Sequence, residues 1–283
     1  MKKKNVRALE FLMENDSLFS CPICHFNLST TKNGLTCFKN HQFELSKKGT
    51  LFFLKKLPKT EYDKEMFLPR GRMIQSGMYA PIIEKMSKLL DKNGTTLDIG
   101  CGEGSFLNLL TMRGLEGIKI GFDISKDGVY EATNQPIYEN IFWCIADLTN
   151  LPFAENSFNQ LLNIFTPSQY TEFKRVLKPG GKLIKIIPEQ NYLKELRTAF
   201  YPDDAQKQDY SNELVVQKLK DEMIILLDER ISYSFEIPKN NQLDLLEMSP
   251  LEWGVSEEIK NNLKKQPLSS ITIDIRVIVA EFA

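Results

Sequence analysis

The sequence carries its first chemical signal where three glycines with single-residue spacing follow a short apolar run. The run covers residues 95–99, and Gly100, Gly102 and Gly104 come directly after it. Because glycine has no Cβ atom, such a turn can bend sharply and lets a ligand approach the backbone closely. The pattern predicts a strand, a tight turn and a helix that begins near Ser105. In an open α/β sheet, a ligand lies beyond the carboxyl end of such a strand.

The spacing of these glycines also limits which ligand is expected. It is G-x-G-x-G, which differs from the G-x-G-x-x-G of dinucleotide binding and lacks the Lys-Ser/Thr pair of a P-loop. We therefore expect a nucleoside ligand without a pyrophosphate. For this motif taken alone, an ordinary strand–turn–helix junction without a ligand is the alternative.

Acidic residues mark three apolar runs, and the runs are separated by the lengths typical of βαβ units. Asp98 lies in the first run, Asp123 follows the run 118–122, and Asp147 follows the run 141–146. In this architecture the acid at the end of the second strand accepts hydrogen bonds from both ribose hydroxyls. The acid after the third strand is expected beside an adenine amino group. Together the acids predict one nucleoside-binding crevice at the edge of a parallel sheet.

A second group of residues has the spacing of a metal site. Cys21 and Cys24 form a C-x2-C pair, and Cys37 and His41 follow after twelve and three intervening residues. Three thiolates and one imidazole make the closed tetrahedral set of structural zinc sites, so we expect Zn²⁺ here. His25 is the weaker alternative for the fourth ligand, and a redox cysteine pair is the other alternative. Metal binding would supply most of the folding energy of so short a segment.

The net charge of −1 is divided unevenly along the chain. Residues 1–72 contain fourteen lysines and arginines against seven acids, a charge of +7 that leaves −8 for residues 73–283. This asymmetry predicts that the N-terminal part meets a polyanion, although lysines that merely solvate a small domain are the alternative. Four phenylalanines lie among the lysines and could stack on bases, but a role in a small core is favoured for them: Phe38, Phe43, Phe52 and Phe53.

The composition of the 283 residues is that of a globular protein. Hydrophobic residues make up 42% and charged residues 26%, values that are ordinary for folded domains. No apolar run approaches the roughly 20 residues that a membrane helix needs, and the N-terminal lysines precede no apolar signal-peptide region. We therefore expect a cytoplasmic protein without membrane contact, in which the cysteines stay reduced.

The chain divides into three parts on composition. Residues 1–54 would form an N-terminal extension and the zinc-binding ribbon, which one or two strands near its end complete. Residues 55–78 contain prolines, glycines and basic side chains that break regular structure, and are expected to be a linker. Residues 79–283 would form the nucleoside-binding domain, which starts with a helix because apolar residues recur there at helical spacing.

Two strand-like runs predict how this domain ends. The runs 230–237 and 270–282 flank a helical pattern at 241–263, and they are expected to pair as a final antiparallel hairpin. The polar and acidic stretch 200–222 is expected to be an insertion or a lid.

The strand-terminal acids, together with the turn Leu-Lys-Pro-Gly-Gly-Lys-Leu at 177–183, resemble the class I S-adenosylmethionine-dependent methyltransferases. This resemblance implies an α/β, Rossmann-like domain with a seven-stranded sheet. With the C-x2-C-x12-C-x3-H ribbon ahead of it, the chain resembles the RlmA family of bacterial 23S rRNA (guanine-N1)-methyltransferases. The segment 164–167 looks more like the Gram-positive, tylosin-resistance-like subgroup. Further stretches that carry the resemblance are 20–25, 40–43, 77–81, 97–104 and 246–253.

The resemblance implies S-adenosylmethionine as cofactor, a structural Zn²⁺, and a 23S rRNA stem-loop near the peptide exit tunnel as substrate and partner. A homodimer is a further expectation from the family. The zinc ligands it implies are Cys21, Cys24, Cys37 and His41. The cofactor-binding residues, from the crevice argument and the resemblance together, are Tyr79, Asp98, Gly100, Gly102, Glu103, Gly104, Asp123, Asp147 and Tyr192.

Tyr192 departs from the family pattern, because relatives can have histidine at this place. It can still cover the cofactor, but a role that requires imidazole would be lost. The sequence identifies no general base for guanine N1. A small-molecule methyltransferase is one alternative function, although it leaves the ribbon without a purpose. A non-catalytic RNA-binding zinc protein is the other alternative.

Overall fold

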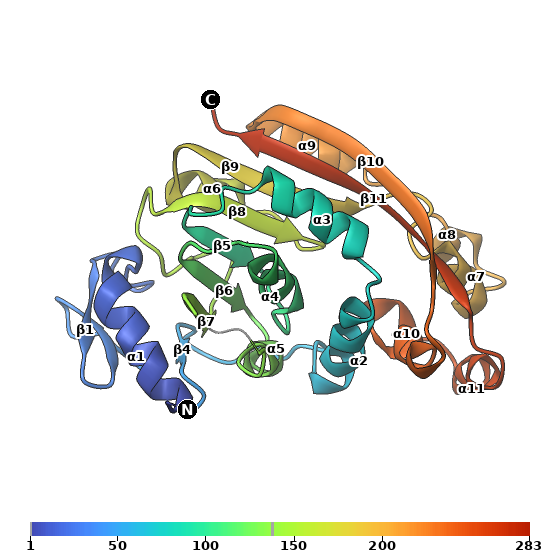
Figure 1. The fold of residues 1–283 in the computed structure, drawn as a ribbon, viewed down its shortest axis with the longest axis horizontal. Coiled ribbons are helices and arrows are strands. Elements are labelled where there is room, and N and C mark those ends of the chain that lie inside the picture. The colour runs from blue at the N-terminus through green and yellow to red at the C-terminus, as the bar shows by residue number, and fades with distance from the viewer. Residues whose placement is uncertain (1, 137–138) are drawn as a thin grey trace.

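The computed structural model describes residues 2–136 and 139–283, and its centre is an eight-stranded sheet with helices on both faces (Figure 1). The strand order is β10-β11-β9-β8-β5-β6-β7-β4. Strands β4 to β9 run parallel, and β11 is antiparallel to both of its neighbours. The strands of this sheet are β4 (Thr50–Phe52), β5 (Thr96–Ile99), β6 (Lys119–Asp123), β7 (Ile141–Ile145), β8 (Phe158–Ile164), β9 (Leu177–Pro188), β10 (Ile224–Glu236) and β11 (Ser270–Glu281).

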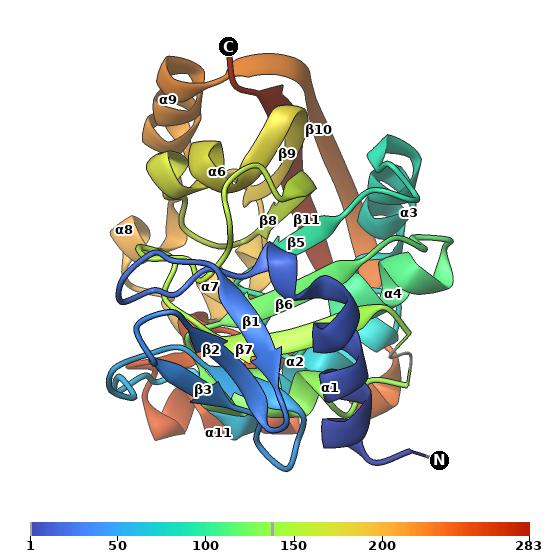
Figure 2. The ribbon, with the colours of Figure 1, turned by 90° about the vertical axis from the view of Figure 1, so that its left-hand side faces the viewer.

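Two hydrophobic cores lie on the two faces of this sheet. Strands such as β7 are buried at every position, as expected for parallel strands that are covered on both sides. One face carries α3 (Ala80–Leu89), α4 (Ser105–Met112) and α5 (Lys126–Ala132). The other carries α6 (Tyr170–Val176) and α9 (Glu213–Glu222), which lie opposite α3 and α4 in the turned view (Figure 2). Helix α1 (Lys4–Asn15) joins the same core at the β7–β4 edge of the sheet.

Strand β4 corrects the prediction for the end of the ribbon. We expected residues up to 54 to finish the ribbon and the main sheet to have seven strands. Instead β4 pairs in parallel with β7, with Thr50 opposite Trp143, and adds an eighth strand to the seven expected ones. Leu51 is fully buried there. The pairing satisfies backbone N–H and C=O groups along the edge of β7 that would otherwise be unpaired.

The ribbon itself is a separate three-stranded antiparallel sheet of β1 (Leu28–Thr31), β2 (Gly34–Cys37) and β3 (Gln42–Glu44). It lies with α1 at the β7–β4 edge of the main sheet (Figure 2). Phe43 and Phe53 are buried with their ring centroids 4.9 Å apart, so these two belong to the core. Phe38 and Phe52 are exposed, which differs from the favoured interpretation of all four as core residues.

The range predicted as a linker contains a helix, α2 (Lys64–Gln75). The Asp63 side chain caps it by accepting a hydrogen bond from the Met66 backbone N–H, at 3.1 Å. Tertiary contacts hold the helix in spite of Pro69 and Gly71, because it packs against α4, α5 and α10 (Asp244–Glu247). The expectation of irregular structure in 55–78 is therefore wrong for 64–75 and agrees with the structure at 55–63 and at 76–78, which form a turn.

The C-terminal third follows the predicted pattern. Strands β10 and β11 form the expected long antiparallel hairpin. The stretch 200–222 contains two helices, and its role as a lid stays a prediction. Among the described residues, no helix has the length and apolar character needed to span a bilayer. The remaining α-helices among the described residues are α7 (Lys194–Phe200), α8 (Ala205–Gln208) and α11 (Glu257–Lys265), and short 3-10 helices lie at Asp16–Leu18, Lys239–Asn241 and Pro250–Glu252.

Candidate cofactor crevice and zinc site

The glycine loop joins β5 to α4 in the predicted strand–turn–helix arrangement. Gly100, Gly102 and Gly104 have φ angles of +65°, +53° and +77°, a region that side-chain-bearing residues rarely adopt. A Cβ atom on Gly100 would lie 2.4 Å from Thr166 Cγ2, and one on Gly104 would lie 2.6 Å from the Trp143 ring. Both the backbone conformation and the close packing therefore require glycine here.

Asp123 at the end of β6 is tied to this loop. Its Oδ2 accepts a hydrogen bond from the Gly102 backbone N–H at 2.9 Å, and its Oδ1 accepts one from the Ser125 N–H at 2.8 Å. Burial raises the pKa of Asp123, and these backbone donors oppose the shift. A carboxylate oxygen has further lone pairs, so each oxygen of Asp123 can accept another donor.

Two more acids beside the glycine loop are buried without full hydrogen bonding. Asp98 is 2% and Glu103 is 4% exposed. Among the described residues, Asp98 Oδ2 and Glu103 Oε2 have no hydrogen-bond donor. Burial raises the pKa of both groups, and it raises that of Asp98 to about 7, with the negative charges of Glu103 and Asp123 adding to the effect. Because burying an uncompensated charge is costly, this arrangement is suited to a cationic group of a ligand.

Arg70 is a neighbour of these acids that the sequence reasoning missed. Its Nε lies 3.8 Å from Glu103 Oε2, and its side chain is 21% exposed. Helix α2 places it there: Phe67 packs on Gly102, where a Cβ would meet the ring at 3.0 Å, and Gly71 lies close to Glu103. The sequence signal was the row of apolar and basic residues at 66–72. We interpreted this row as part of a linker because it contains a proline and a glycine.

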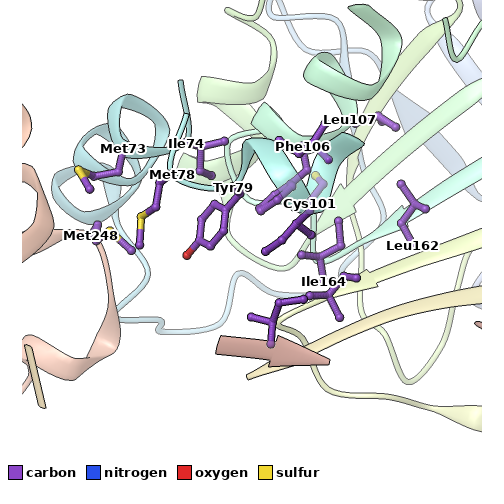
Figure 3. Packing of buried hydrophobic residues seen from close by; sticks show 14 of the residues in the cluster. Met73, Ile74, Met78, Tyr79, Cys101, Phe106, Leu107, Leu162, Ile164 and Met248 are labelled. Carbon is purple, nitrogen blue, oxygen red and sulfur yellow. The ribbon is translucent and has the colours of Figure 1, made fainter. Parts of the chain in front are cut away.

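Tyr79 and Tyr192, predicted from distant parts of the chain, meet in an aromatic cluster. Their hydroxyl oxygens are 2.5 Å apart. Phe165 packs against both, with its ring centroid 5.6 Å from that of Tyr79 and 5.4 Å from that of Tyr192. Figure 3 shows Tyr79 between Met78 on one side and Phe106 and Cys101 on the other. Burial raises the pKa of both tyrosines, so both hydroxyls stay protonated near neutral pH.

The loop after β8 is fixed by a buried lysine. Lys185 Nζ donates to Asn163 Oδ1 and, at 2.8 Å, to Ser168 Oγ. Asn163 in turn donates to Thr166 Oγ1 at 2.5 Å, and Thr166 donates to the Ile99 carbonyl at 3.1 Å. Burial lowers the pKa of Lys185 to about 8.

This network links the loop after β8 to the glycine loop. It also accounts for the left-handed backbone of Phe165 at φ +56°, a strained conformation that the surrounding contacts must hold. Sequence reasoning missed Lys185, although a lysine inside the apolar run 183–187 was a visible signal.

Asp147 follows β7 and begins the loop that reaches the zinc ribbon. Its Oδ1 accepts hydrogen bonds from the Thr149 N–H and hydroxyl, both at 2.8 Å. Three residues further on, Asn150 Nδ2 donates to the Pro22 carbonyl at 2.8 Å, inside the C-x2-C turn. Ser20 also donates to the Phe153 carbonyl at 2.8 Å. The loop that begins at Asp147, where the adenine is predicted to lie, is thus hydrogen-bonded to the turn that carries Cys21 and Cys24.

The predicted zinc ligands gather at one point. The ligand atoms of Cys21, Cys24, Cys37 and His41 all lie within 4.8 Å of one another. Cys24 and Cys37 Sγ are 3.5 Å apart, and His41 Nδ1 is 3.4 Å from Sγ of both Cys21 and Cys37. Zn–S bonds of about 2.3 Å and Zn–N bonds of about 2.0 Å give tetrahedron edges of roughly 3.5–3.8 Å, so these spacings fit zinc. His25, the alternative ligand, is outside this group.

Comparisons with known proteins give matches in both parts of the chain. A family model described as "Methyltransferase domain" matches residues 90–232, and one described as "RlmA, N-terminal" matches residues 19–55. A Bacillus subtilis protein named as the 23S rRNA (guanine-N1)-methyltransferase YxjB is 34% identical over 93% of this chain and 96% of its own length. The 23S rRNA (guanine(748)-N(1))-methyltransferase of Streptomyces fradiae is 24% identical over 92% of this chain and 95% of its own length.

Solved structures support the fold alone. A chain from the Haloferax volcanii complex between the Trm112 methyltransferase activator and a methyltransferase superposes with a TM-score of 0.51 at 17% identity. The superposition covers 79% of this chain and 98% of that one. The α/β methyltransferase architecture predicted from the strand-terminal acids is therefore confirmed.

Proposed function

The chain belongs to the RlmA family of 23S rRNA (guanine-N1)-methyltransferases, and from that premise we propose that it methylates N1 of a guanine in a 23S rRNA stem-loop. The observation that carries the proposal is the loop shared by the predicted adenine end of the crevice and the zinc turn, through the Asn150–Pro22 hydrogen bond. It joins the two parts that an RNA-modifying enzyme needs, a cofactor crevice and a basic appendage.

The residues of the crevice fit S-adenosylmethionine. This cofactor carries an ammonium, a sulfonium and a carboxylate, a net positive charge that suits the buried acids. Asp98 and Glu103 each have one oxygen that accepts no hydrogen bond from the described residues, and these would hold the ammonium group. Arg70 would hold the carboxylate, and Asp123 would accept hydrogen bonds from the ribose hydroxyls. Asp147 would lie at the adenine amino group, so that the cofactor extends along the sheet edge from α2 towards the ribbon.

When bound, the cofactor supplies a methyl group that its sulfonium already activates. The protein must therefore chiefly orient guanine N1 in line with that methyl group and exclude water. The aromatic cluster around Phe165 and the loop fixed by Lys185 border the glycine loop and would provide this positioning. Guanine N1 is protonated and paired in a duplex, so the base must leave its stack before reaction.

The zinc ribbon would hold the RNA stem-loop. Residues 19–55 contain five lysines and one glutamate, which favours contact with phosphates. The ribbon is also fixed rather than tethered, because Ser20, Pro22 and β4 are all hydrogen-bonded to the methyltransferase part. We propose Cys21, Cys24, Cys37 and His41 as its zinc ligands. A homodimer, expected from the family, is a further proposal that light scattering tests.

The function is tested with purified protein, labelled S-adenosylmethionine and transcribed 23S rRNA. Primer extension should stop at one guanine, because a methyl group on N1 blocks Watson–Crick pairing. The same stop should be present in 23S rRNA from wild-type cells and absent in 23S rRNA from a deletion strain. Mapping begins at the position equivalent to guanine 748, for which the Streptomyces fradiae relative is named. Methylation of a metabolite but not of rRNA would favour a small-molecule enzyme. Tight rRNA binding without transfer would favour a non-catalytic binding protein.

A further inference from the structure

Two aromatic rings are exposed side by side on the zinc ribbon. Phe38 is 86% and Phe26 is 47% exposed, and their ring centroids are 6.0 Å apart with an interplanar angle of 57°. Single exposed apolar residues are common on protein surfaces. This pair is different because both rings lie together and Ile23, 46% exposed, lies in the same turn region.

The metal site fixes the backbone beneath both rings. Phe26 comes two residues after Cys24, and Phe38 comes directly after Cys37. The Cys21 N–H donates to the Phe26 carbonyl at 2.8 Å, which closes the first turn. A ring that is almost wholly exposed on a rigid turn adds little to the ribbon's own core. Its backbone, however, is already held by the turn, so that little backbone entropy would be lost on binding.

The chemistry around the rings favours a nucleic acid over a protein. Lys39 Nζ lies 5.5 Å from the Phe26 ring centroid. The whole ribbon, residues 19–55, has five lysines against one glutamate. Protein–protein interfaces are enriched in aromatic residues but depleted in lysine. Exposed ring faces beside lysines are instead the combination with which proteins hold unpaired bases of single strands and loops.

We propose that Phe38 and Phe26 form a stacking platform for an unpaired base of the RNA stem-loop, with Lys39 at a neighbouring phosphate. The proposal rests on the proposed function and adds how the stem-loop is recognised. Because the turn that holds Cys21 is hydrogen-bonded to Asn150, a base stacked on the platform is held at a fixed place relative to the crevice. The platform thus selects an RNA that presents an unpaired base at that place.

The test compares three substitutions of one ring, Phe38→Ala, Phe38→Leu and Phe38→Trp. The probe is a transcribed 23S rRNA fragment that contains the mapped guanine, and its affinity is measured by filter binding at several salt concentrations. We expect Ala and Leu to weaken binding roughly 5- to 150-fold, the range for loss of one stacked base, and Trp to bind like the wild type. The dependence on salt should not change, because stacking releases no counterions.

Two further variants separate stacking from charge and from general surface effects. Lys39→Gln should reduce the slope of log affinity against log salt by about 0.7–0.9, the value of one phosphate contact. Leu214→Ala on α9 is the matched control, since Leu214 is also 86% exposed, and it should leave RNA binding unchanged. Zinc content of about one per chain in every variant shows that the ribbon is still folded.

The proposal of a stacking platform would be overturned if the Phe38→Ala variant bound RNA as tightly as the wild type. It would also be overturned if Phe38→Leu kept the RNA affinity and Phe38→Trp lost it. A change of oligomeric state in Phe38→Ala without a change in RNA affinity would assign the rings to a second copy and also overturn the inference. In these cases methylation of rRNA by the wild type still stands. If the wild type neither binds nor methylates rRNA, the proposed function itself fails.

Discussion

Replacement of Asp98 by asparagine should stabilise the protein alone and weaken its binding of cofactor. Asp98 is buried with Oδ2 unpartnered, and its pKa is about 7 against a usual 3.8. At about 1.36 kcal/mol per pKa unit, ionised Asp98 destabilises the folded state by about 4 kcal/mol. The folded state binds more protons than the unfolded state between pH about 4 and 7. The free energy of unfolding therefore falls as pH rises through this window and is lowest above it.

The assay is urea unfolding of the wild type and of Asp98→Asn at pH 5 and pH 8, at constant ionic strength. At pH 5, about 1.2 pH units above the usual pKa of 3.8, about 1.6 kcal/mol of this destabilisation is already present. The unpartnered buried amide of the variant offsets it, so we expect the two proteins to differ by less than about 1 kcal/mol. At pH 8 the variant should be more stable by about 1–3 kcal/mol, less than the full amount because the buried amide also lacks partners. Calorimetry should show S-adenosylmethionine binding weakened by about 1.5–3 kcal/mol, since a neutral amide cannot pair with the ammonium group.

Asp274→Asn is the matched control. Asp274 is also buried, but it accepts hydrogen bonds from Arg230 at 2.8 and 2.6 Å, and these lower its pKa. Its contribution to stability is present above its usual pKa and is lost as pH falls. The variant should therefore be less stable than the wild type at pH 8, the opposite of the change expected for Asp98→Asn. Equal destabilisation of Asp98→Asn at both pH values would refute the raised pKa of Asp98. An unchanged dissociation constant for the cofactor would refute the assignment of Asp98 to the ligand.

Three further predictions address the other parts of the site. Asp123→Ala should weaken S-adenosylmethionine binding by about 1–3 kcal/mol, because hydrogen bonds to a charged acceptor are lost; an unchanged affinity in calorimetry would contradict this. Cys37→Ala should reduce zinc from about one per chain to none in metal analysis, whereas retained zinc would exclude Cys37 as a ligand. Lys185→Met should lower kcat more than it raises KM for the cofactor, because the loop that carries Phe165 loses its anchor. Restoration of kcat by Lys185→Arg but not by Lys185→Gln would support an anchoring role, and an unaltered kcat would exclude it.

The parts of the molecule that the sequence predicted well are those with local causes. The glycine loop at 100–104 needs left-handed backbone at three fixed positions, and only glycine satisfies this at no steric cost. The C-x2-C turn likewise places two ligands by local geometry. Two long strand-like runs predicted the final hairpin, and they pair as β10 and β11.

The parts that the sequence did not reveal depend on distant partners. Strand β4 is three residues long, and nothing within Thr50–Phe52 specifies that it pairs with β7, some ninety positions later. Helix α2 contains a proline and a glycine, and it is held by contacts such as the ion pair of Arg72 with Asp244. Because that helix went unrecognised, so did Arg70, whose place beside Glu103 exists only when α2 lies over the glycine loop.

The joining of β4 to the main sheet has a thermodynamic consequence. Residues 45–49 alone separate β3 of the ribbon from β4, and β4 is hydrogen-bonded to the strand that leads to Asp147. Loss of the metal would release the ribbon and loosen this edge, so chelation should lower the affinity for the nucleoside. Since such coupling is reciprocal for binding free energies, a saturating nucleoside should strengthen the binding of the metal by the same free energy. The two bound groups would then protect each other across the shared edge of the sheet.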